Sequence, residues 1–314
     1  MGNIGCHAKT TSERLSTLSR AILNPRRAVD RWRELRRSWS EETNRQAKNE
    51  ARVAGIARKS VASILDAYVT EPPSYDSAFK LFEGEWSSNI PGYRGGHAAL
   101  FDDARIRWFA EQCGGFKGKR VLELGPLEGG HTSMIANAGA ASVTAIECNT
   151  RAFLKCLIVQ NALKFKADFL LGDFRLYLEK CNETFDVLIA SGVLYHMLNP
   201  VSFLTNCARV SNRIALWTHY YDPEIIRANG HLREKFDPSP RIERIGSRQI
   251  ILYRQNYFEA LQWKGFCGGS APASYWLTRD SLLGLLQDLG FTVVIGDDTK
   301  THPNGPAMAV FASR

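Results

Sequence analysis

The sequence contains no C-x-x-C pair and no apolar run long enough to span a bilayer. The first absence argues against a disulfide framework or a zinc site built on thiolates. The 7 scattered cysteines favour reduced thiols in a cytoplasmic protein. The second absence predicts a chain without a transmembrane helix. The N-terminus also lacks the apolar core and cleavage site of a secretory signal, so we expect no secretion.

Acidic residues are scarce at the N-terminus, where residues 1–60 hold 14 Lys and Arg against 6 Asp and Glu. The net charge of +8 therefore lies in this segment, and the remaining residues balance at 26 basic and 26 acidic groups. A basic arm of this kind can contact nucleic acid, an acidic membrane surface or an acidic partner. A solvated helix face explains the same charges equally well.

The N-terminal part of the chain is predicted to be helical over residues 26–68. An apolar stripe at three- and four-residue spacing runs through Val29, Trp32, Leu35 and Trp39. This stripe packs either on its own domain or on a second subunit, so a homodimer stays open. We divide the chain into a basic helical N-terminal region and cap, residues 1–112, and a second domain, residues 113–314.

From Lys119 onward, short apolar segments alternate with helical patterns. The expected strands are 121–124, 142–146, 168–171, 185–190, 213–218, 291–295 and 307–312. The expected helices are 98–112, 130–139, 151–163, 174–181, 200–210 and 279–289. Such alternation predicts an α/β domain with a doubly wound, seven-stranded and mostly parallel sheet. The last two strands form an antiparallel pair, and a polar, aromatic-rich insertion at about 220–276 is expected to cover the cleft.

Two motifs follow the first two strands, where doubly wound folds bind their ligands. A glycine turn with Gly125 and Gly129 allows the backbone to approach a ligand closely, and Glu123 can accept from an ammonium group. Glu147 closes the second strand, and its two oxygens can bind both ribose hydroxyls of a nucleoside cofactor. Alternatively, the turn is purely structural and Glu147 is an exposed or helix-capping residue.

Further candidates follow the third, fourth and fifth strands. Asp173 can accept from an adenine amine while Phe174 packs on the adenine ring, or Asp173 is the N-cap of the next helix. The fourth strand leads to Tyr195 and His196, and the fifth ends at His219. Because these strands flank the switch point of the sheet, we expect both clusters to face the ligand.

With these motifs in this order, residues 118–314 resemble the class I S-adenosylmethionine (SAM) dependent methyltransferases. The resemblance implies a sheet of order 3-2-1-4-5-7-6 with strand 7 antiparallel, and SAM as cofactor. It also implies contacts with the methionine part at Gly125 and Gly129, with ribose at Glu147, with adenine at Asp173 and Phe174, and near the sulfonium at Ser191 and Gly192.

The turn departs from the usual Gly-x-Gly-x-Gly of that family, because its middle position is Leu127. Since the outer glycines remain, we expect an altered turn that still binds the cofactor. Within the family, Gly192-Val193-Leu194-Tyr195-His196 followed by Asn199-Pro200 is similar to a branch that includes tRNA wobble-uridine carboxymethyltransferases. That branch also contains methyltransferases of small molecules, so the loop leaves the substrate open.

Methyl transfer needs an aligned nucleophile and, for an O or protonated N nucleophile, a base. Histidine titrates near neutral pH, so His196 and His219 are the candidate bases, with Tyr195 and Tyr220 as orienting groups. For each histidine a packing or capping role is the alternative. No metal site is expected, because His219 and Asp222 offer too few ligands.

Three functions remain compatible with the sequence. The first is methyl transfer to an N or O nucleophile of a small molecule. The second is an RNA-modifying methyltransferase whose basic arm binds phosphates. The third is a non-enzymatic partner protein that binds SAM. A nicotinamide dehydrogenase is disfavoured, because the first turn lacks Gly-x-Gly-x-x-Gly.

Overall fold

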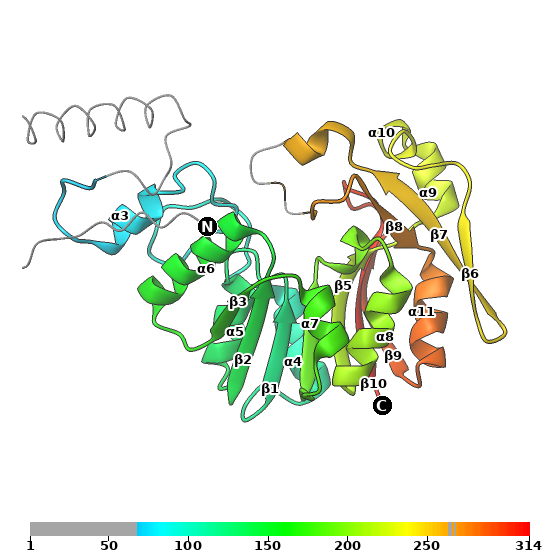
Figure 1. The fold of residues 1–314 in the computed structure, drawn as a ribbon, viewed down its shortest axis with the longest axis horizontal. Coiled ribbons are helices and arrows are strands. Elements are labelled where there is room, and N and C mark those ends of the chain that lie inside the picture. The colour runs from blue at the N-terminus through cyan, green and yellow to red at the C-terminus, as the bar shows by residue number, and fades with distance from the viewer. Residues whose placement is uncertain (1–67, 263–265, 267) are drawn as a thin grey trace, which may run out of the picture. The chain divides into compact units, whose positions relative to one another are not determined.

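Seven strands form one central sheet in the order β3-β2-β1-β4-β5-β10-β9 (Figure 1). The computed structural model describes residues 68–262, 266 and 268–314. Strand β10 pairs antiparallel with both β5 and β9, and the other pairs are parallel. The predicted strand order and its antiparallel end are therefore confirmed. The strands are β1 (Arg120–Leu124), β2 (Ser142–Glu147), β3 (Asp168–Leu171), β4 (Val187–Ser191), β5 (Arg213–His219), β9 (Thr292–Thr299) and β10 (Ala307–Ser313).

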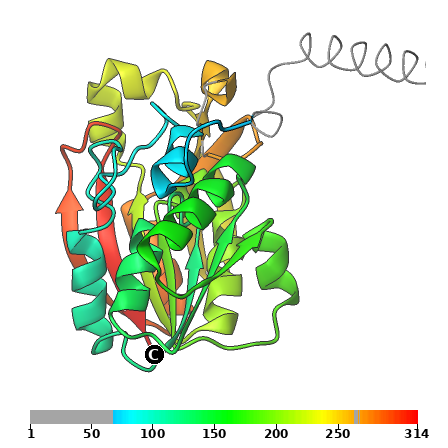
Figure 2. The same ribbon diagram turned by 90° about the vertical axis from the view of Figure 1, so that its left-hand side faces the viewer.

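Helices cover both faces of this sheet (Figure 2). Asp103, Asn149 and Asp173 are the N-caps of α4, α6 and α7, and each side chain accepts a backbone N–H of the first turn. Such caps explain why the helices begin where they do. The helices that follow or precede the strands are α4 (Ala104–Cys113), α5 (Gly130–Asn137), α6 (Thr150–Leu163), α7 (Phe174–Lys180), α8 (Pro200–Val210) and α11 (Arg279–Asp288).

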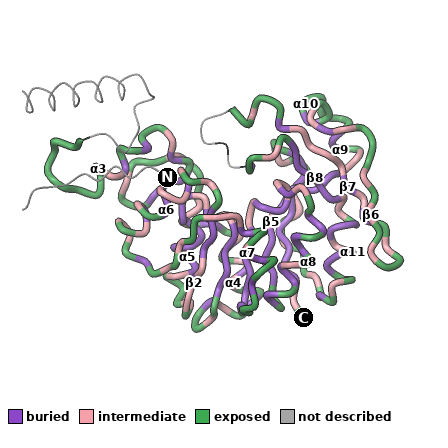
Figure 3. Tube along the Cα trace, viewed as in Figure 1, coloured by how far each residue is buried: buried purple, intermediate pink, exposed green. Residues whose placement is uncertain are grey.

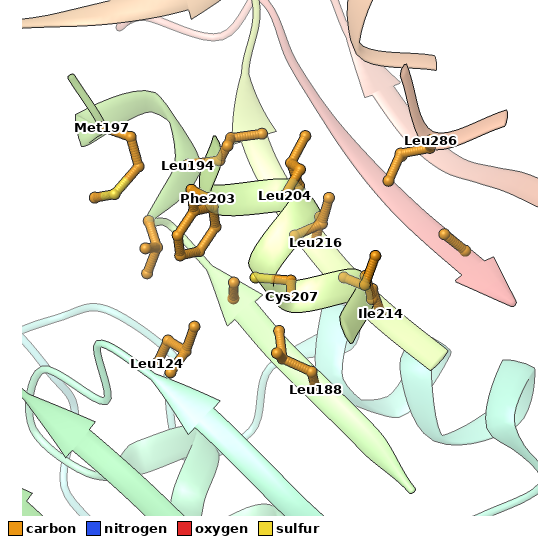
Figure 4. Close-up of a cluster of buried hydrophobic side chains, with 14 of the residues drawn as sticks. Leu124, Leu188, Leu194, Met197, Phe203, Leu204, Cys207, Ile214, Leu216 and Leu286 are labelled. Carbon is orange, nitrogen blue, oxygen red and sulfur yellow. The ribbon is translucent and has the colours of Figure 1, made fainter. Parts of the chain in front are cut away.

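Two apolar clusters, one on each face, hold the helices to the sheet. Neighbouring residues of β1 belong to different clusters: Val121 packs with α4 and α5, and Leu122 packs with α7, α8 and α11. This follows from the alternation of side chains along a strand. Both faces are buried along the central strands (Figure 3), as expected for a mainly parallel sheet. Figure 4 shows Leu204 and Cys207 of α8 beside Leu188, Ile214 and Leu216 of β4 and β5.

The insertion contains a second sheet that the sequence analysis did not predict. Its three antiparallel strands, in the order β6-β7-β8, are β6 (Arg241–Ile245), β7 (Arg248–Asn256) and β8 (Ala273–Leu277). Gly246 and Ser247 form the tight turn between β6 and β7, with Gly246 at φ +55°. Two short helices, α9 (Pro223–Ala228) and α10 (Gly230–Arg233), precede this sheet, and η4 (Phe258–Gln262) follows β7.

A buried ion pair attaches the segment before α4 to the main domain. Lys155 on α6 donates to Glu128 Oε1 at 2.9 Å and to the backbone oxygen of Glu85. The Glu128 carboxylate also accepts the backbone N–H groups of Ser87 and Ser88 at 2.9 and 2.8 Å. Glu128 is fully buried, so its charge depends on these donors. The segment that contains α3 (Tyr75–Lys80) is thereby fixed beside the glycine turn.

The predicted basic arm, residues 1–60, and most of the predicted helical region 26–68 lie outside the described residues. Helix α4 packs on the central sheet and confirms the second part of the helix expected over 98–112, but it begins at Ala104, because Asp103 is its N-cap. Residues Glu71–Arg314 form one compact unit. The boundary at residue 112 and the roles of the arm stay predictions. Within the described residues, no helix is both long enough and apolar enough to cross a membrane.

Removing the Lys155 ammonium tests the buried ion pair. We expect Lys155→Ala to lower the free energy of unfolding by about 3–5 kcal/mol, because the Glu128 charge stays buried without its cation. Urea unfolding followed by circular dichroism measures this. Lys80→Ala, which breaks the exposed pair with Glu71, is the matched control and should leave the unfolding midpoint unchanged. Equal midpoints for both variants would contradict the anchoring role.

Candidate active site

A cavity of about 740 Å³ lies at the carboxyl ends of the parallel strands. Its walls come from the turn after β1, the ends of β2 and β4, the start of α7 and Trp217 of β5. Residues of the insertion, Phe266 and Gly268 to Ala271, close another side. Ligands of doubly wound folds bind at this edge, so the cavity is the candidate site.

Most of the predicted site residues line this cavity, and four of them do not, one of which, Tyr220, is described further below. Those on the wall are Gly125, Glu147, Asp173, Phe174, Ser191, Gly192, Tyr195 and His196. Glu123, Gly129 and His219 are absent from the wall, and each is fixed by contacts described below. The roles assigned to all of these residues stay predictions, because position alone does not establish them.

The turn after β1 passes repeatedly through the left-handed region of φ. Gly125, Leu127 and Gly129 have φ of +69°, +57° and +74°. Leu127 therefore adopts, at the middle position of the turn, a conformation that favours glycine. Its backbone N–H donates to Glu147 Oε2 at 3.1 Å, which helps to hold this conformation. The altered turn expected from the sequence thus keeps a tight, left-handed path.

Two of the glycines are required by close packing. A Cβ on Gly125 would lie 2.9 Å from Cγ2 of Val193, which follows β4. A Cβ on Gly129 would lie 3.3 Å from Cζ of Phe169, and Gly129 is the N-cap of α5. Gly129 therefore supports the turn from behind, whereas Gly125 exposes its backbone to the cavity.

Glu147 links the turns after β1 and β2. Its Oε2 accepts from Leu127, and its Oε1 accepts the N–H of Asn149 at 2.9 Å. Burial raises the pKa of this carboxyl group above its ordinary value, although the backbone N–H groups oppose the shift. Each carboxylate oxygen has a second acceptor position, so the pair can still receive two hydroxyl groups from the cavity.

Asp173 is the N-cap that the sequence analysis kept open as an alternative. Its Oδ1 accepts the N–H of Arg175 at 2.8 Å, and the Arg175 guanidinium donates to both carboxylate oxygens. The hydrogen bond from Arg175 holds the pKa of Asp173 below its usual value. Phe174 is buried against Phe203 with ring centroids 5.9 Å apart. Adenine contacts by this pair stay a prediction.

A buried polar chain under the cavity was not identified from the sequence. His131 Nε2 lies 2.8 Å from Asp103 Oδ2, and Arg105 donates to both oxygens of Asp103. His131 Nδ1 lies 4.0 Å from Glu123 Oε1, and Thr132 donates to the other Glu123 oxygen at 2.5 Å. Glu123 thus lies behind His131, and its buried position raises its pKa.

Two of these hydrogen-bonded polar residues, His131 and Arg105, line the cavity. Burial opposes ionisation of Asp103, but hydrogen bonds from His131 and Arg105 hold its pKa below the ordinary value. The Arg105 guanidinium also lies over the Trp217 ring, 4.6 Å from its centroid. His131 directly follows the glycine turn, and this position was the only sign in the sequence that His131 belongs to the site. Arg105 belongs to a segment assigned to the N-terminal region, and only the tertiary structure brings it here.

Aromatic rings surround the two candidate bases. The Tyr195 ring lies 4.2 Å from that of His196 and 4.7 Å from that of His219, between centroids. His196 lines the cavity, and its Nδ1 lies 2.7 Å from the hydroxyl oxygen of Tyr257. Burial, together with His219, lowers the pKa of His196 to about 4, so His196 is neutral at pH 7.

His219 is buried behind Tyr195 and stacks on Trp276, with ring centroids 5.0 Å apart. Its Nδ1 lies 2.9 Å from the backbone oxygen of Gly305, which can only accept, so Nδ1 carries the proton. Burial, with His302, lowers the pKa of His219 to about 4. These contacts fix the turn before β10. They match the packing role that the sequence analysis gave as the alternative to a base.

Tyr220, expected as an orienting group, lies in the apolar core and is not on the cavity wall. Its hydroxyl group donates to Asp298 Oδ1 at 2.8 Å, and Arg279 donates to the other oxygen of Asp298. Because side chains alternate along an extended segment, Tyr220 points away from the side that His219 occupies. The described residues contain no group of three His, Cys, Asp or Glu that could bind a metal ion.

The residues present fit the cofactor that the resemblance implies. The hydroxyl group of Ser191 is shielded from solvent, lines the cavity and has no partner among the described residues. A buried hydroxyl without a partner costs free energy, which a bound polar ligand would recover. Glu147 supplies acceptors for ribose hydroxyls nearby, and the backbone of Gly125 lines the cavity beside the turn.

Comparisons with known proteins agree with this geometry. Residues 122–213 match the family model Methyltransf_11, a methyltransferase domain. The N-terminal domain of EvdMO1, solved in the presence of SAH and D-fucose, is 23% identical, with a TM-score of 0.54 over 76% of this chain and 94% of that chain. The whole of EvdMO1 gives 21% identity and a TM-score of 0.50 over 76% of this chain and 46% of that chain. No curated protein matches.

A third similar structure is magnesium protoporphyrin IX methyltransferase (ChlM) from Synechocystis PCC 6803 with bound SAH. It is 17% identical, with a TM-score of 0.46 over 68% of this chain and 81% of that chain. The domain match confirms the predicted enzyme class, a methyltransferase, with SAM as cofactor. The EvdMO1 domain confirms the Rossmann-like fold. The tRNA wobble-uridine branch, a nucleic acid partner and a homodimer are not confirmed.

Removing the Glu147 carboxylate tests the cofactor site. We expect Glu147→Ala to weaken S-adenosylhomocysteine binding by roughly 10- to 100-fold, because hydrogen bonds to a charged acceptor contribute about 1.5–3 kcal/mol. Calorimetric titration measures the affinity. Glu147→Gln, which keeps one oxygen acceptor, should lose less, and Glu179→Ala on the exposed side of α7 should lose nothing. Unchanged affinity in Glu147→Ala would remove this residue from the site.

The two neutral histidines make folding depend on pH. Their folded pKa of about 4 lies below the unfolded value of about 6.5, so the unfolded chain binds more protons between these limits. Stability therefore falls as pH drops from about 6.5 towards 4, by up to roughly 1.4 kcal/mol per pH unit for each histidine. Urea midpoints across this range should decline less steeply in His219→Gln. A slope equal to that of the wild type would show that His219 is charged when folded.

Proposed function

We propose that this protein transfers the methyl group of SAM to an N or O nucleophile of a small molecule. The observation that carries the proposal is a neutral histidine, His196, on the wall of a cavity of about 740 Å³. Small-molecule sites have volumes of about 300–1,000 Å³ and combine apolar walls with few polar groups. The balanced charge of the catalytic part of the sequence also favours a small substrate over RNA.

Two groups of residues on the cavity wall suit different tasks. Glu147, Ser191 and the turn at Gly125 offer acceptors, a hydroxyl group and open backbone for the cofactor. Tyr195, His196 and Trp217, which follow or belong to β4 and β5, offer aromatic surface and a base for the substrate. Bound SAM supplies a methyl group on a positively charged sulfur, which is already reactive toward nucleophiles. The protein therefore contributes mainly orientation.

His196 is suited to take the proton that the nucleophile loses. With a pKa of about 4, its ring is neutral at pH 7 and has a lone pair available. So low a pKa also makes it a weak base, which suits a nucleophile that becomes acidic as the new bond to carbon forms. No described residue bonds its Nε2, so this nitrogen is available to a ligand. Tyr195 packs against the ring and limits its motion.

The test starts with calorimetric titration of SAM and S-adenosylhomocysteine, with NAD as control. Next, label from methyl-labelled SAM is followed into a panel of small molecules with hydroxyl or amine groups. Sugars belong in this panel because the EvdMO1 domain was solved in the presence of D-fucose. We expect labelled small molecules with the wild type and much less label with Glu147→Ala at a SAM concentration near the wild-type Kd. Label that enters only RNA, or binding without any transfer, would contradict the proposal.

With an acceptor identified, His196→Gln tests the base. We expect turnover to fall about 10²- to 10⁴-fold, the usual contribution of a general base, while the affinity for S-adenosylhomocysteine stays near that of the wild type. Steady-state kinetics and calorimetry measure the two effects. His231→Gln on the exposed helix α10 is the matched control and should keep full turnover. Normal turnover in His196→Gln would exclude His196 as the base.

A further inference from the structure

The guanidinium group of Arg105 is held at the cavity wall from two directions. Its Nε donates to both oxygens of Asp103 at 3.0 Å, and its Nη2 donates to Asp103 Oδ2. Asp103 is itself fixed, because it is buried and its Oδ2 lies 2.8 Å from His131 Nε2. On the other side the guanidinium lies over the Trp217 ring, 4.6 Å from its centroid. A group restrained in this way loses little freedom when it binds a ligand.

One edge of this guanidinium has no partner. A guanidinium carries five N–H groups in a planar fork geometry that matches the two oxygens of a carboxylate. Asp103 occupies the edge formed by Nε and Nη2. No residue in the described part of the chain accepts from Nη1, so the edge between Nη1 and Nη2 is unpaired. Arg105 lines the cavity, and its side chain is 27% exposed, so a bound molecule can reach it.

A second arginine on the cavity wall shows what is particular to Arg105. Arg175 also pairs through Nε and Nη2 with the N-cap of its own helix, Asp173. This pairing is a local feature of a helix start and indicates no ligand by itself. The Arg175 side chain is 50% exposed, so water competes for its N–H groups. Arg105, in contrast, is shielded by Trp217, and its carboxylate partner is held by His131.

The position of Arg105 along the sheet favours a substrate group over the cofactor. The candidate cofactor residues lie at the ends of β1, β2 and β4, and β5 is the next strand in the sheet. Trp217, below the guanidinium, belongs to β5 and is paired with Ser191 at the end of β4. The Trp217 ring lies 6.1 Å from the Tyr195 ring, which lies 4.2 Å from that of His196, between centroids. A group bound to Arg105 therefore lies beside the aromatic residues that lead to the candidate base.

The charges around Arg105 favour a directed contact over a general attraction. Burial opposes ionisation of Asp103, but hydrogen bonds from His131 and Arg105 hold its pKa below the ordinary value. The Asp103–Arg105 pair is therefore neutral overall, so a ligand anion gains mainly from two hydrogen bonds of fixed geometry. A carboxylate offers two acceptor oxygens, whereas an amide offers only one. A phosphate group would add a further negative charge that this pair does not balance.

We propose that Arg105 binds a carboxylate group of the methyl acceptor, so that the substrate is a small carboxylic acid with a separate hydroxyl or amine group. The carboxylate stays bound and unchanged while that hydroxyl or amine takes the methyl group and the bond from methyl carbon to sulfur breaks. The products are the methylated acid and S-adenosylhomocysteine, and His196 receives the proton that the nucleophile loses. The reaction rests on the function proposed above, but carboxylate binding at Arg105 is measurable without it.

Two acids and their neutral counterparts test the site on the full-length chain before any acceptor is identified. Benzoate and D-glucuronate are titrated into protein saturated with S-adenosylhomocysteine, with benzamide and D-glucose as neutral probes. The indole N–H signal of Trp217 in ¹H–¹⁵N NMR spectra reports binding, and the spectrum of Trp217→Phe assigns it. We expect at least one acid to bind roughly 10- to 100-fold more tightly than its neutral counterpart, because charged hydrogen bonds are lost in the latter.

Variants of Arg105 separate the fork from its charge. Arg105→Met keeps a long side chain but no donor, and we expect it to lose the preference for the acid while keeping its affinity for S-adenosylhomocysteine. Arg105→Lys keeps the charge without the fork, so it should retain only part of the preference. Arg107→Met on the same helix is the matched control, because Arg107 is exposed and pairs with Asp102. It should behave as the wild type, and thermal unfolding confirms that each variant is folded.

Three results would overturn the inference. The first is equal affinity for both acids and their neutral counterparts in the wild type. The second is an unchanged preference in the folded variants Arg105→Met and Arg105→Lys. The third is weaker binding of S-adenosylhomocysteine by Arg105→Met with unchanged binding of methylthioadenosine, which lacks the amino-acid tail. In that case the fork would bind the carboxylate of the cofactor.

The outcome also separates this inference from the proposed function. If an acid binds as expected but no small molecule accepts label from SAM, the proposed function fails and the carboxylate site stands. If label is transferred, acceptors with a carboxylate should be preferred, and Arg105→Met should raise their KM roughly tenfold or more with a smaller effect on kcat. Transfer to neutral acceptors alone would leave the proposed function standing and overturn the inference.

Discussion

The site depends on one carboxylate that joins two turns. Glu147 accepts backbone N–H groups from both Leu127 and Asn149. Leu127 is held at φ +57°, which costs a non-glycine residue roughly 1–2 kcal/mol, comparable to the contribution of one hydrogen bond to a charged group. Without Glu147 the turn would lose its main polar restraint. The same group thus shapes the turn and supplies acceptors to the cavity, which explains why a leucine is tolerated there.

Much of the fold was predictable, because strands and helices of the central sheet alternate with clear apolar patterns. The expected helix over 200–210 is α8, and the strand order followed from the resemblance. The candidate cofactor residues were equally visible, since they occupy strand ends in sequence order. The small sheet was missed, although the alternation in Arg241–Ile245 and the Gly246-Ser247 turn were available signals of a hairpin. Charged residues and an aromatic-rich composition obscured them.

The partners of the candidate bases could not be predicted. Tyr257 is 61 residues from His196, and Gly305 is 86 residues from His219. Such contacts arise only when the insertion and the β10 turn pack against the ends of β4 and β5. The sequence also gave no means of separating His196 from His219. Burial lowers the pKa of both to about 4, and only the cavity wall distinguishes the two.

The turn between β6 and β7 lies far along the chain from His196, yet β7 leads directly to Tyr257, whose hydroxyl oxygen lies 2.7 Å from Nδ1 of that histidine. Because side chains alternate along a strand, a slip of one residue between β7 and β8 would move Gln255 to the opposite face of the sheet from Ser274. A one-residue deletion within β7 would therefore disturb the strand that leads to Tyr257, whereas a longer turn at Gly246 would leave this pairing in register. Natural variation in length should be tolerated at the tip of this hairpin and absent from its strands.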